Sequence, residues 1–547
     1  MKPYIILILL VAIAYANSLQ NSFVWDDTDI IVNNPKINLS IKEIPSVFTT
    51  SLWGMAGFSE RQDYYRPVIF LLYVLNYKIW GLNPFGFHLI HILIHLINAV
   101  ILYRIGLILF NDNLISLIGA SVFAVHPVNN EPVEWVSTGD VVFGFFIILS
   151  IYFFLKEKRY LSWITFFLAL LSKEGAIMLP FALIIFSICR NGFKKGVIAI
   201  TPYLALSGIY LFIRMNVVDI VLVLGADIKQ PIFIQVITMA VAAFDYIKLL
   251  IIPYPLSPFY PAKWHTSVFE PKVILAIIVL ISISFLAFKI RKDRVMLFLL
   301  ISPFIMLAPV IWMVNMFMAG EDNVYIAERY LYVPAMFFSI FAPALLVKIF
   351  NDRARRYLNI GWILIIIIFT YTTASSSAAW KNDITLFKKI IEKSPEAAFA
   401  HNNLGNVYAD EGRLDEAIKE YLTALKIKPY YASVHNNLGT AYYEKGNVDM
   451  AIKEYMMALK IKPDYADAHN NLGAAYYEQG KIDEAIKEYL ASLKVSSDFA
   501  PAHYNLGRTY WKKGLKQDAR KEFEMVLKLK PDFAPAKKAL ESLDKDK

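Results

Sequence analysis

Hydrophobic residues are distributed unevenly along this chain. Residues 1 to about 375 consist mainly of long apolar runs separated by short polar turns, whereas the remainder is rich in Lys, Glu, Asn and Ala. A straight transmembrane helix needs roughly 20 predominantly apolar residues, and several runs reach that length. The pattern therefore predicts an all-α protein with a polytopic transmembrane domain over residues 1–375, followed by a polar helical tail.

About eleven of the apolar runs are predicted to cross the membrane. The stretches Arg66–Trp80 and Gln235–Ile252 carry polar or charged residues, and we predict that both lie along the surface, although their composition leaves a crossing open. Lys2 and the first run also fit a cleaved signal peptide, but we favour a retained anchor because cleavage would detach the polar loop that follows. The predicted spans cover residues 4–19, 86–110, 113–125, 139–155, 160–172, 175–189, 196–213, 272–289, 295–311, 330–349 and 358–375.

Basic residues in the short turns set the orientation, because positively charged loops stay in the cytoplasm. With Lys2 and the basic turns inside, the C-terminal tail lies outside. We therefore expect a multi-pass protein of the cytoplasmic (inner) or ER-type membrane, with the active loops and the tail on the extracytoplasmic or lumenal side. The loops gathered on that side are residues 20–85, 126–138, 214–271 and 312–329, together with the Lys173–Glu174 turn.

The composition supports a membrane protein. Of the 547 residues, 57 % are hydrophobic and only 18 % are charged, which excludes an ordinary soluble protein. The net charge of +9 does not indicate a nucleic-acid partner, because much of the Lys and Arg lies in the turns that set the topology. Cys189 is the single cysteine, so no intrachain disulfide can form.

The outer loops carry unusual charged residues. The segment Ser22–Pro35 places the adjacent carboxylates Asp26 and Asp27 directly after the first apolar run. Ionised groups beside a membrane segment must stay hydrated or paired, so the presence of two adjacent carboxylates there indicates a functional role. The alternative is a solvated loop with acids at a helix start. The other candidates in these loops are Arg66, His126, Glu131, Glu134, Asp140, Lys173, Glu174, Glu328 and Arg329.

These residue types suit glycosyl transfer from a lipid-linked sugar phosphate. A carboxylate can take the proton of the attacking hydroxyl, and Arg66, Lys173 and Arg329 can stabilise the departing phosphate. No nucleotide is required, and the chain has no Gly-rich phosphate loop. The alternatives are that the three cations snorkel at helix ends and that His126 ends a helix.

We predict no cofactor. His88, His91 and His95 share one face of a span, a spacing that could suggest a metal, but no carboxylate accompanies them. Packing or hydrogen bonding across helices is the favoured interpretation. A divalent metal at the Asp26–Asp27 pair is the less favoured alternative.

From Pro395 the chain repeats every 34 residues, which is the tetratricopeptide period. The pentapeptide HNNLG recurs in successive repeats, small Gly and Ala let two antiparallel helices approach, and Pro stops the second helix. We predict a connecting helix or partial repeat over residues 376–394. Residues 395–547 then form four repeats closed by a capping helix, Ala534–Leu543.

One side-chain amide recurs on the first helix of every repeat. Amides so placed can bond both the donor and the acceptor of an extended peptide backbone, which predicts an acceptor-peptide groove. The alternative is that they bond within the array. The four residues are Asn403, Asn437, Asn471 and Asn505.

The ordered motifs FVWDD, YYRP, HPVNNEPVEWVSTGD, LSKEG and AERYLY, followed by the repeats, resemble the transmembrane-and-tetratricopeptide-containing (TMTC) family, which belongs with the protein O-mannosyltransferases in the GT-C class. The resemblance implies a GT-C-type transmembrane domain and an inverting transferase that uses a polyprenyl-phosphate monosaccharide. It assigns the base to Asp26 or Asp27 and phosphate contacts to Lys173–Glu174 and Arg329. Ser137–Asp140 stands where family members often carry Gly-Arg-Ala-Asp, and the missing Arg leaves the sugar and lipid preference open.

We therefore expect transfer of a mannose-like hexose to Ser or Thr of exported proteins, with the repeats presenting the acceptor. The alternatives are a repeat-bearing membrane scaffold without catalysis and a glycosyltransferase acting on a lipid or cell-wall glycan. A scaffold needs few spans and has no use for the aspartate pair. A transporter is disfavoured because the acids cluster at one face and not at mid-membrane.

Overall fold

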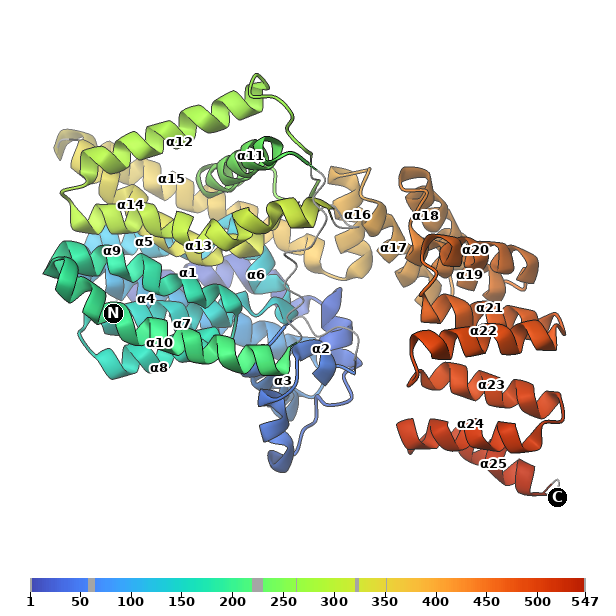
Figure 1. Ribbon diagram of the computed structural model, residues 1–547. Helices are drawn as coiled ribbons and strands as arrows, with labels where there is room; N and C mark the ends of the chain where they lie inside the picture. The colour runs from blue at the N-terminus through green and yellow to red at the C-terminus, as the bar shows by residue number, and fades with distance from the viewer. Residues whose placement is uncertain are drawn as a thin grey trace. The chain divides into compact units, whose positions relative to one another are not determined.

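The computed structural model describes residues 2–57, 64–218, 230–261, 263–319, 324–350 and 352–545. Within these ranges the chain is almost entirely helical, which confirms the predicted all-α class (Figure 1). It divides into two compact units, Met1–Lys389 and Ile390–Lys547. Parts of the predicted outer loops, at 58–63, 219–229, 262 and 320–323, lie outside the described residues.

The first unit is a helical bundle whose helix bounds follow the apolar runs closely. α5 shows why: it begins where the Asp112 carboxylate accepts hydrogen bonds from Leu114 N and Ile115 N, and it ends before the His126–Pro127 turn. The helices are α1 (Lys2–Tyr15), α2 (Leu52–Met55), α3 (Pro67–Trp80), α4 (Pro84–Phe110), α5 (Asn113–Val125), α6 (Asn130–Glu134), α7 (Asp140–Leu155), α8 (Arg159–Leu170), α9 (Leu179–Asn191), α10 (Phe193–Val217), α11 (Ile232–Ile251), α12 (Pro271–Ile290), α13 (Arg294–Ala319), α14 (Tyr332–Ile349) and α15 (Asp352–Ser376). Two short strands, β1 (Tyr260–Pro261) and β2 (Val324–Ile326), pair antiparallel.

Among the residues that the structure describes, eight segments are long and apolar enough to cross a membrane, and they support a multi-pass membrane protein. Seven coincide with predicted spans, whereas the eighth, α11, is one we predicted to lie along the surface. The runs at 113–125, 139–155 and 160–172 form helices of only 13, 16 and 12 residues. The eight segments are Lys2–Gln20, Pro84–Phe110, Phe193–Val217, Ile232–Ile251, Pro271–Ile290, Arg294–Val314, Glu328–Ile349 and Arg356–Trp380.

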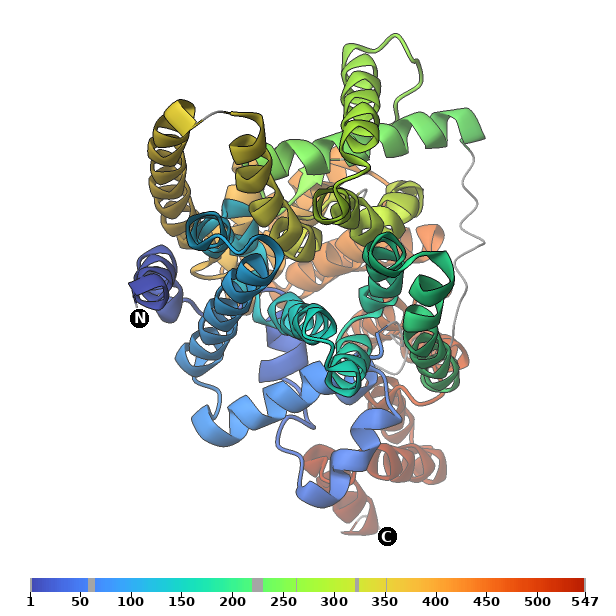
Figure 2. The ribbon, with the colours of Figure 1, turned by 90° about the vertical axis from the view of Figure 1, so that its left-hand side faces the viewer.

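Helices α3 and α11 run in a different direction from α10 and α12 (Figure 2). Figure 2 looks nearly along α10 and α12, and in this view α3 and α11 lie across that direction. Such an orientation is the one expected of helices that follow a membrane surface. Since α11 is nonetheless long and apolar enough to cross, the predicted topology depends on this helix.

The second unit is a stack of antiparallel helix pairs (Figure 1). Glycine permits each pair to pack closely: a Cβ added at Gly405 would lie 2.6 Å from the Tyr421 ring. The last helix, α25, covers the final apolar face through Ala536 and Leu543, which cluster with Phe523. The helices after α16 (Asp383–Lys393) are α17 (Ala398–Asp410), α18 (Leu414–Ile427), α19 (Ala432–Glu444), α20 (Val448–Ile461), α21 (Ala466–Glu478), α22 (Ile482–Val495), α23 (Ala500–Lys512), α24 (Lys516–Leu529) and α25 (Ala534–Lys545).

Candidate active site

The two adjacent aspartates have different environments. The Asp27 side chain is fully buried, and its carboxylate accepts hydrogen bonds from Ser137 N at 2.7 Å and from Val24 N at 3.2 Å. Burial raises the pKa of Asp27 to about 7, and the hydrogen bonds offset only part of that rise. Asp26 remains partly exposed. Asp27 therefore ties the first loop to the turn before α7, while Asp26 keeps access to solvent.

Each candidate phosphate-binding cation pairs with a candidate acid. The pairs join segments that are far apart in the sequence, so they lock the predicted outer loops against one another. In the Lys173–Asp140 pair the side chains are only 10 % and 3 % exposed, and this inward orientation differs from that of snorkelling residues. The pairs are Arg66–Glu174 at 3.0 Å, Lys173–Asp140 at 2.5 Å and Arg329–Glu131 at 2.5 Å.

The charges around Glu174 keep it ionised. Burial alone would raise the pKa of its carboxyl, but Arg66 and Lys173 outweigh burial and lower the pKa to about 2. Conversely, burial disfavours the guanidinium of Arg66, yet the Glu174 charge raises its pKa overall. Glu174 and Arg66 are therefore both charged at neutral pH.

A cavity of about 260 Å³ adjoins all three ion pairs, because Asp140, Lys173, Glu174 and Arg329 line it. Its polar lining includes three cations, Lys173, Arg214 and Arg329. An apolar wall from α13 faces them, with Met306, Pro309, Val310 and Met313 among its residues. A cavity with convergent cations beside an apolar wall has the chemistry to hold an anionic head group and a hydrocarbon chain.

Trp135 connects the aspartate loop to this cavity. Its ring stacks on Trp25 with centroids 4.8 Å apart and planes at 11°. The guanidinium carbon of Arg329, which lines the cavity, lies 5.2 Å from the Trp135 ring centroid. The residue preceding Asp26 is thus separated from a cavity cation by a single aromatic ring.

The phenol of Tyr73 marks a second point where the loops converge. It donates a hydrogen bond to the Val136 carbonyl at 3.2 Å. Burial raises its pKa, the charges of Asp27 and Asp140 raise it further, and Arg66 opposes them. The charges of Asp27, Asp140 and Arg66 therefore all act on this one phenol.

Gly139 allows the two elements at this point to approach. Its φ of 69° is in the left-handed region that glycine adopts without strain, and it immediately precedes Asp140 at the start of α7. A Cβ at this position would lie 2.8 Å from Ile69 Cδ1 of α3. The glycine thus brings α3 and the start of α7 together beside the ion pairs.

Three candidates make packing contacts and do not line the cavity. His126 Nε2 donates to the Leu250 carbonyl of α11 at 3.0 Å, and His126 lies in the turn that ends α5, as the alternative interpretation expected. The Glu134 carboxylate accepts hydrogen bonds from Ser18 and, at 2.8 Å, from Asn21 Nδ2. The Glu328 carboxylate accepts from Tyr260 Oη at 2.6 Å and from Ser257 N at 3.0 Å. These contacts hold the outer segments to the bundle.

The histidines of α4 are buried, and one bonds across helices. His95 Nδ1 lies 2.8 Å from Tyr332 Oη, and its Nε2 lies 3.0 Å from the Ala124 carbonyl. This arrangement agrees with the favoured interpretation of the histidine face. Among the residues that the structure describes, no three His, Cys, Asp or Glu side chains gather as a metal site requires.

The recurring asparagines bond to one another between repeats. Asn437 Nδ2 donates to Asn402 Oδ1 at 3.1 Å and to Asn406 Oδ1 at 3.0 Å. The same contact joins later repeats, from Asn471 to Asn436 at 3.1 Å and from Asn505 to Asn470 at 3.0 Å. Asn403 Oδ1 accepts from Asn402 Nδ2 at 3.3 Å. The ladder therefore uses these amides within the array, as the alternative interpretation expected.

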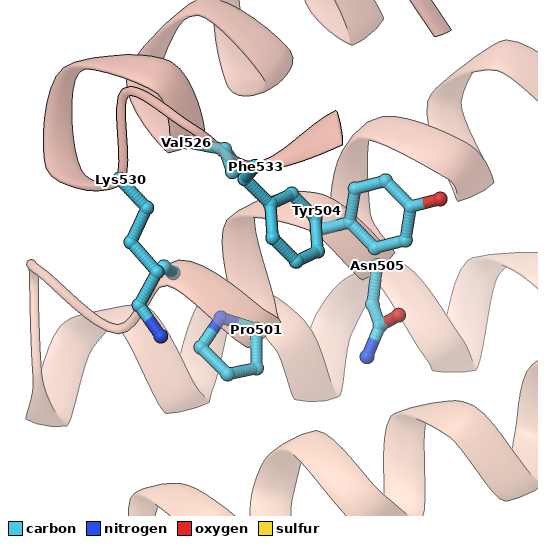
Figure 3. Close-up of a pocket in the computed structure, with 7 residues that line it drawn as sticks. Pro501, Tyr504, Asn505, Val526, Lys530 and Phe533 are labelled. Carbon is cyan, nitrogen blue, oxygen red and sulfur yellow. The ribbon is translucent and has the colours of Figure 1, made fainter. Parts of the chain in front are cut away.

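The fourth repeat instead carries a small cavity of about 160 Å³ (Figure 3). Tyr504, which stands where the other repeats have the first Asn of the pentapeptide, forms one wall together with Phe533. The two rings meet edge-to-face at 5.2 Å. The Lys530 ammonium and the Asn505 amide lie on either side of Pro501 in Figure 3. The cavity thus combines an apolar floor with a cationic rim.

Sequence reasoning missed three residues at these sites. Trp135 lies inside a quoted motif, and its being a tryptophan beside the polar run STGD was the only signal. Arg214, near the end of α10, has no acidic neighbour in sequence and resembled an ordinary basic residue at the end of a span. Tyr504 could have been found as the single departure from HNNLG among the four repeats.

The comparisons with known proteins confirm the repeats. A model described as "TPR repeat" matches residues 405–446, 439–480 and 473–514, and models described as "Tetratricopeptide repeat" match residues 386–419 and 500–533. Among solved structures, the TPR protein YrrB is 24 % identical, with 29 % of this chain and 81 % of that chain covered and a TM-score of 0.26. A MamA protein is 28 % identical, with 28 % and 83 % covered and a TM-score of 0.25.

Curated relatives match most of the chain. Protein O-mannosyl-transferase F38B6.6 of Caenorhabditis elegans is 26 % identical, with 79 % of this chain and 63 % of the relative covered. Human protein O-mannosyl-transferase TMTC1 is 25 % identical, with 76 % and 54 % covered, and mouse TMTC3 is 24 % identical, with 78 % and 51 % covered. The chain spans about half to two-thirds of the length of these relatives. Together with the repeat matches, this extended similarity confirms the family resemblance: the protein is a distant homologue of the TMTC protein O-mannosyl-transferases, with tetratricopeptide repeats at its C-terminal end.

Proposed function

We propose that the protein is a membrane glycosyltransferase that moves a mannose-like hexose from a polyprenyl phosphate to Ser or Thr of exported proteins, with inversion. The names of its distant homologues support this reaction class. The observation that carries the proposal is the cavity in which Lys173, Arg214 and Arg329 face an apolar wall. Its lining suits a phosphate attached to a long hydrocarbon chain.

In this proposal Asp26 is the general base. The acceptor hydroxyl attacks the anomeric carbon, its proton passes to the Asp26 carboxylate, and a new C–O bond forms as the bond from carbon to the phosphate oxygen breaks. The polyprenyl phosphate departs with the bonding electrons, and attack from the opposite face inverts the anomeric centre. Asp27 is less suited to this role because its carboxylate is buried and already accepts two backbone hydrogen bonds.

The cations act on the leaving group. Lys173 and Arg329 line the cavity, and their charges stabilise the negative charge that develops on the phosphate. Asp140 and Glu131 hold these two side chains in place before the donor arrives. Arg66 pairs with Glu174, which itself lines the cavity, so Arg66 would act mainly by orienting that wall.

The direct test is sugar transfer by the full chain. Membranes containing the protein, supplied with radiolabelled mannosyl polyprenyl phosphate, are expected to label exported proteins on Ser or Thr. Label confined to lipid or glycan would favour a glycan transferase instead. An absence of transfer, with protein partners still recovered on the repeats, would favour a scaffold.

The proposed topology places the aspartate loop and the repeats on one side of the membrane. We expect Ser22→Cys and Tyr430→Cys, each in a Cys189→Ser background, to react with a membrane-impermeant thiol reagent from the same side. Both positions are exposed, so reagent access depends on the side alone. Labelling from opposite sides would contradict the proposal. It would mean that the number of membrane crossings between the two positions differs from the predicted number by an odd number, as it would if α11 also crossed the membrane.

We further propose that the cavity of the fourth repeat contacts the acceptor polypeptide, taking an apolar side chain with an acidic group near Lys530. Lys530→Glu is expected to raise KM for the protein acceptor by about 10-fold and to leave kcat unchanged, since a rim charge reversal mainly weakens association. Lys462→Glu, at the equivalent position of the second repeat, is the matched control. Equal effects of the two substitutions would mean that the cavity is not the contact site.

A further inference from the structure

The segment that leads into the repeats contacts the aspartate loop. Asp383 Oδ1, in the first turn of α16, accepts a hydrogen bond from Trp25 N at 2.7 Å, and the Lys381 carbonyl accepts one from Ser22 N at 2.9 Å. The Phe387 ring lies edge-on to Trp25 with centroids 5.6 Å apart. Three contacts thus fasten the backbone just before Asp26 to the start of α16.

Trp25 adopts a backbone conformation that its side chain disfavours. Its φ is 54°, in the left-handed region, where the Cβ of any residue other than glycine comes too close to the following carbonyl oxygen. Such a conformation persists only where surrounding contacts over-determine it, and it is found preferentially at functional sites. Here the contacts are the Trp135 stack on the ring and the Asp383 carboxylate on the backbone N–H.

This conformation determines where the two following side chains point. A left-handed residue reverses the direction of the chain locally, and Asp26 and Asp27 follow it directly. Asp27 then turns inward to Ser137 N and Val24 N, while Asp26 stays partly exposed. If Trp25 relaxed to an extended conformation, the exposed and the buried aspartate would both be displaced.

We infer that Asp383 is a positioning residue for sugar transfer: by accepting the Trp25 N–H it holds the strained turn that sets the direction of the Asp26 carboxylate. The inference rests on the proposed function of Asp26 as general base. Asp383 is not among the residues that line the cavity, and its hydrogen bond to Trp25 N is the contact through which it acts. Its role also explains why an acid from the segment leading into the repeats lies against the first loop.

The test separates positioning from folding. Asp383→Ala removes the acceptor and is expected to lower kcat by about 10–100-fold at unchanged donor and acceptor KM, since a displacement near 1 Å of a catalytic group can cost that much. Asp383→Asn retains an oxygen that can accept the Trp25 N–H and is expected to keep kcat within about 2-fold of wild type.

Asn382→Ala is the matched control, because Asn382 Oδ1 accepts the hydrogen bond of Thr385 N and so caps the same helix, whereas the acceptor of the Trp25 N–H is Asp383. It should lower the melting temperature of the full chain and leave kcat unchanged. Two results would overturn the inference: Asp383→Ala with wild-type kcat, or equal losses of kcat in Asp383→Ala and Asn382→Ala at equal loss of melting temperature. Failure of the proposed function would appear differently, as absence of transfer by the wild-type chain.

Discussion

Replacing Asp26 with Asn is expected to lower kcat for sugar transfer by about 10²–10⁴-fold, the range over which a general base usually contributes. The amide has nearly the shape of the carboxylate but cannot take the proton of the attacking hydroxyl. KM for the polyprenyl donor should change little, because the donor phosphate meets the cations of the cavity. Single-turnover transfer from a radiolabelled donor in membranes measures the chemical step directly.

Asp27→Asn is the control for Asp26→Asn, because it replaces the neighbouring carboxylate that is not the proposed base. The Asn oxygen can still accept the Ser137 N–H, so the loop remains attached and the loss of kcat should be much smaller than for Asp26→Asn. Retained activity in both single variants and in the double variant would remove the aspartate pair from the mechanism. A larger loss for Asp27→Asn would exchange the roles of the two residues.

Replacing Lys173 with Met is expected to destabilise the protein by about 3–5 kcal/mol, because it leaves the buried Asp140 carboxylate without its partner. The Lys173 side chain is 10 % exposed and that of Asp140 only 3 %, so solvent cannot replace the lost ammonium. The same variant should bind the donor more weakly, since Lys173 lines the cavity. Thermal unfolding in detergent and donor KM measure the two effects separately.

The double variant Lys173→Met/Asp140→Asn separates structure from function. Removing both charges should restore most of the stability but none of the donor affinity, because the cation is still absent. Arg190→Met is the matched control: the Arg190–Glu157 pair is 48 % and 71 % exposed, and such pairs contribute about 0–1 kcal/mol. Full recovery of donor KM in the double variant would mean that Lys173 serves only to balance Asp140.

The repeat array and the helix bounds could be predicted because their signals are local. The Gly that recurs every 34 residues meets a ring on its partner helix, as Gly405 meets Tyr421. Residues 113–125 form a helix with the predicted bounds, because Asp112 caps its start and Pro127 follows its end. A capping side chain and a proline act within a few residues, so they are visible in a single sequence.

The partners within the candidate site could not be predicted in the same way. Arg66 and Glu174 are 108 residues apart, and Lys173 and Asp140 are 33 apart, and many other acids were available in the outer loops. Likewise, the recurring asparagines would look the same in the sequence whether their amides bind a peptide or hydrogen-bond to one another between repeats. The choice between them depends on the distance between neighbouring repeats, which places Asn437 Nδ2 3.1 Å from Asn402 Oδ1.

By itself the sequence determined the all-helical class, the apolar character of the first part, the tetratricopeptide period and the set of charged residues available for chemistry, because these depend on residue type and spacing along the chain. Only the tertiary structure distinguished Asp26 from Asp27, which are identical and adjacent in the sequence. The difference comes from Trp25, whose left-handed backbone is held by Trp135 and Asp383, residues brought near it only by folding.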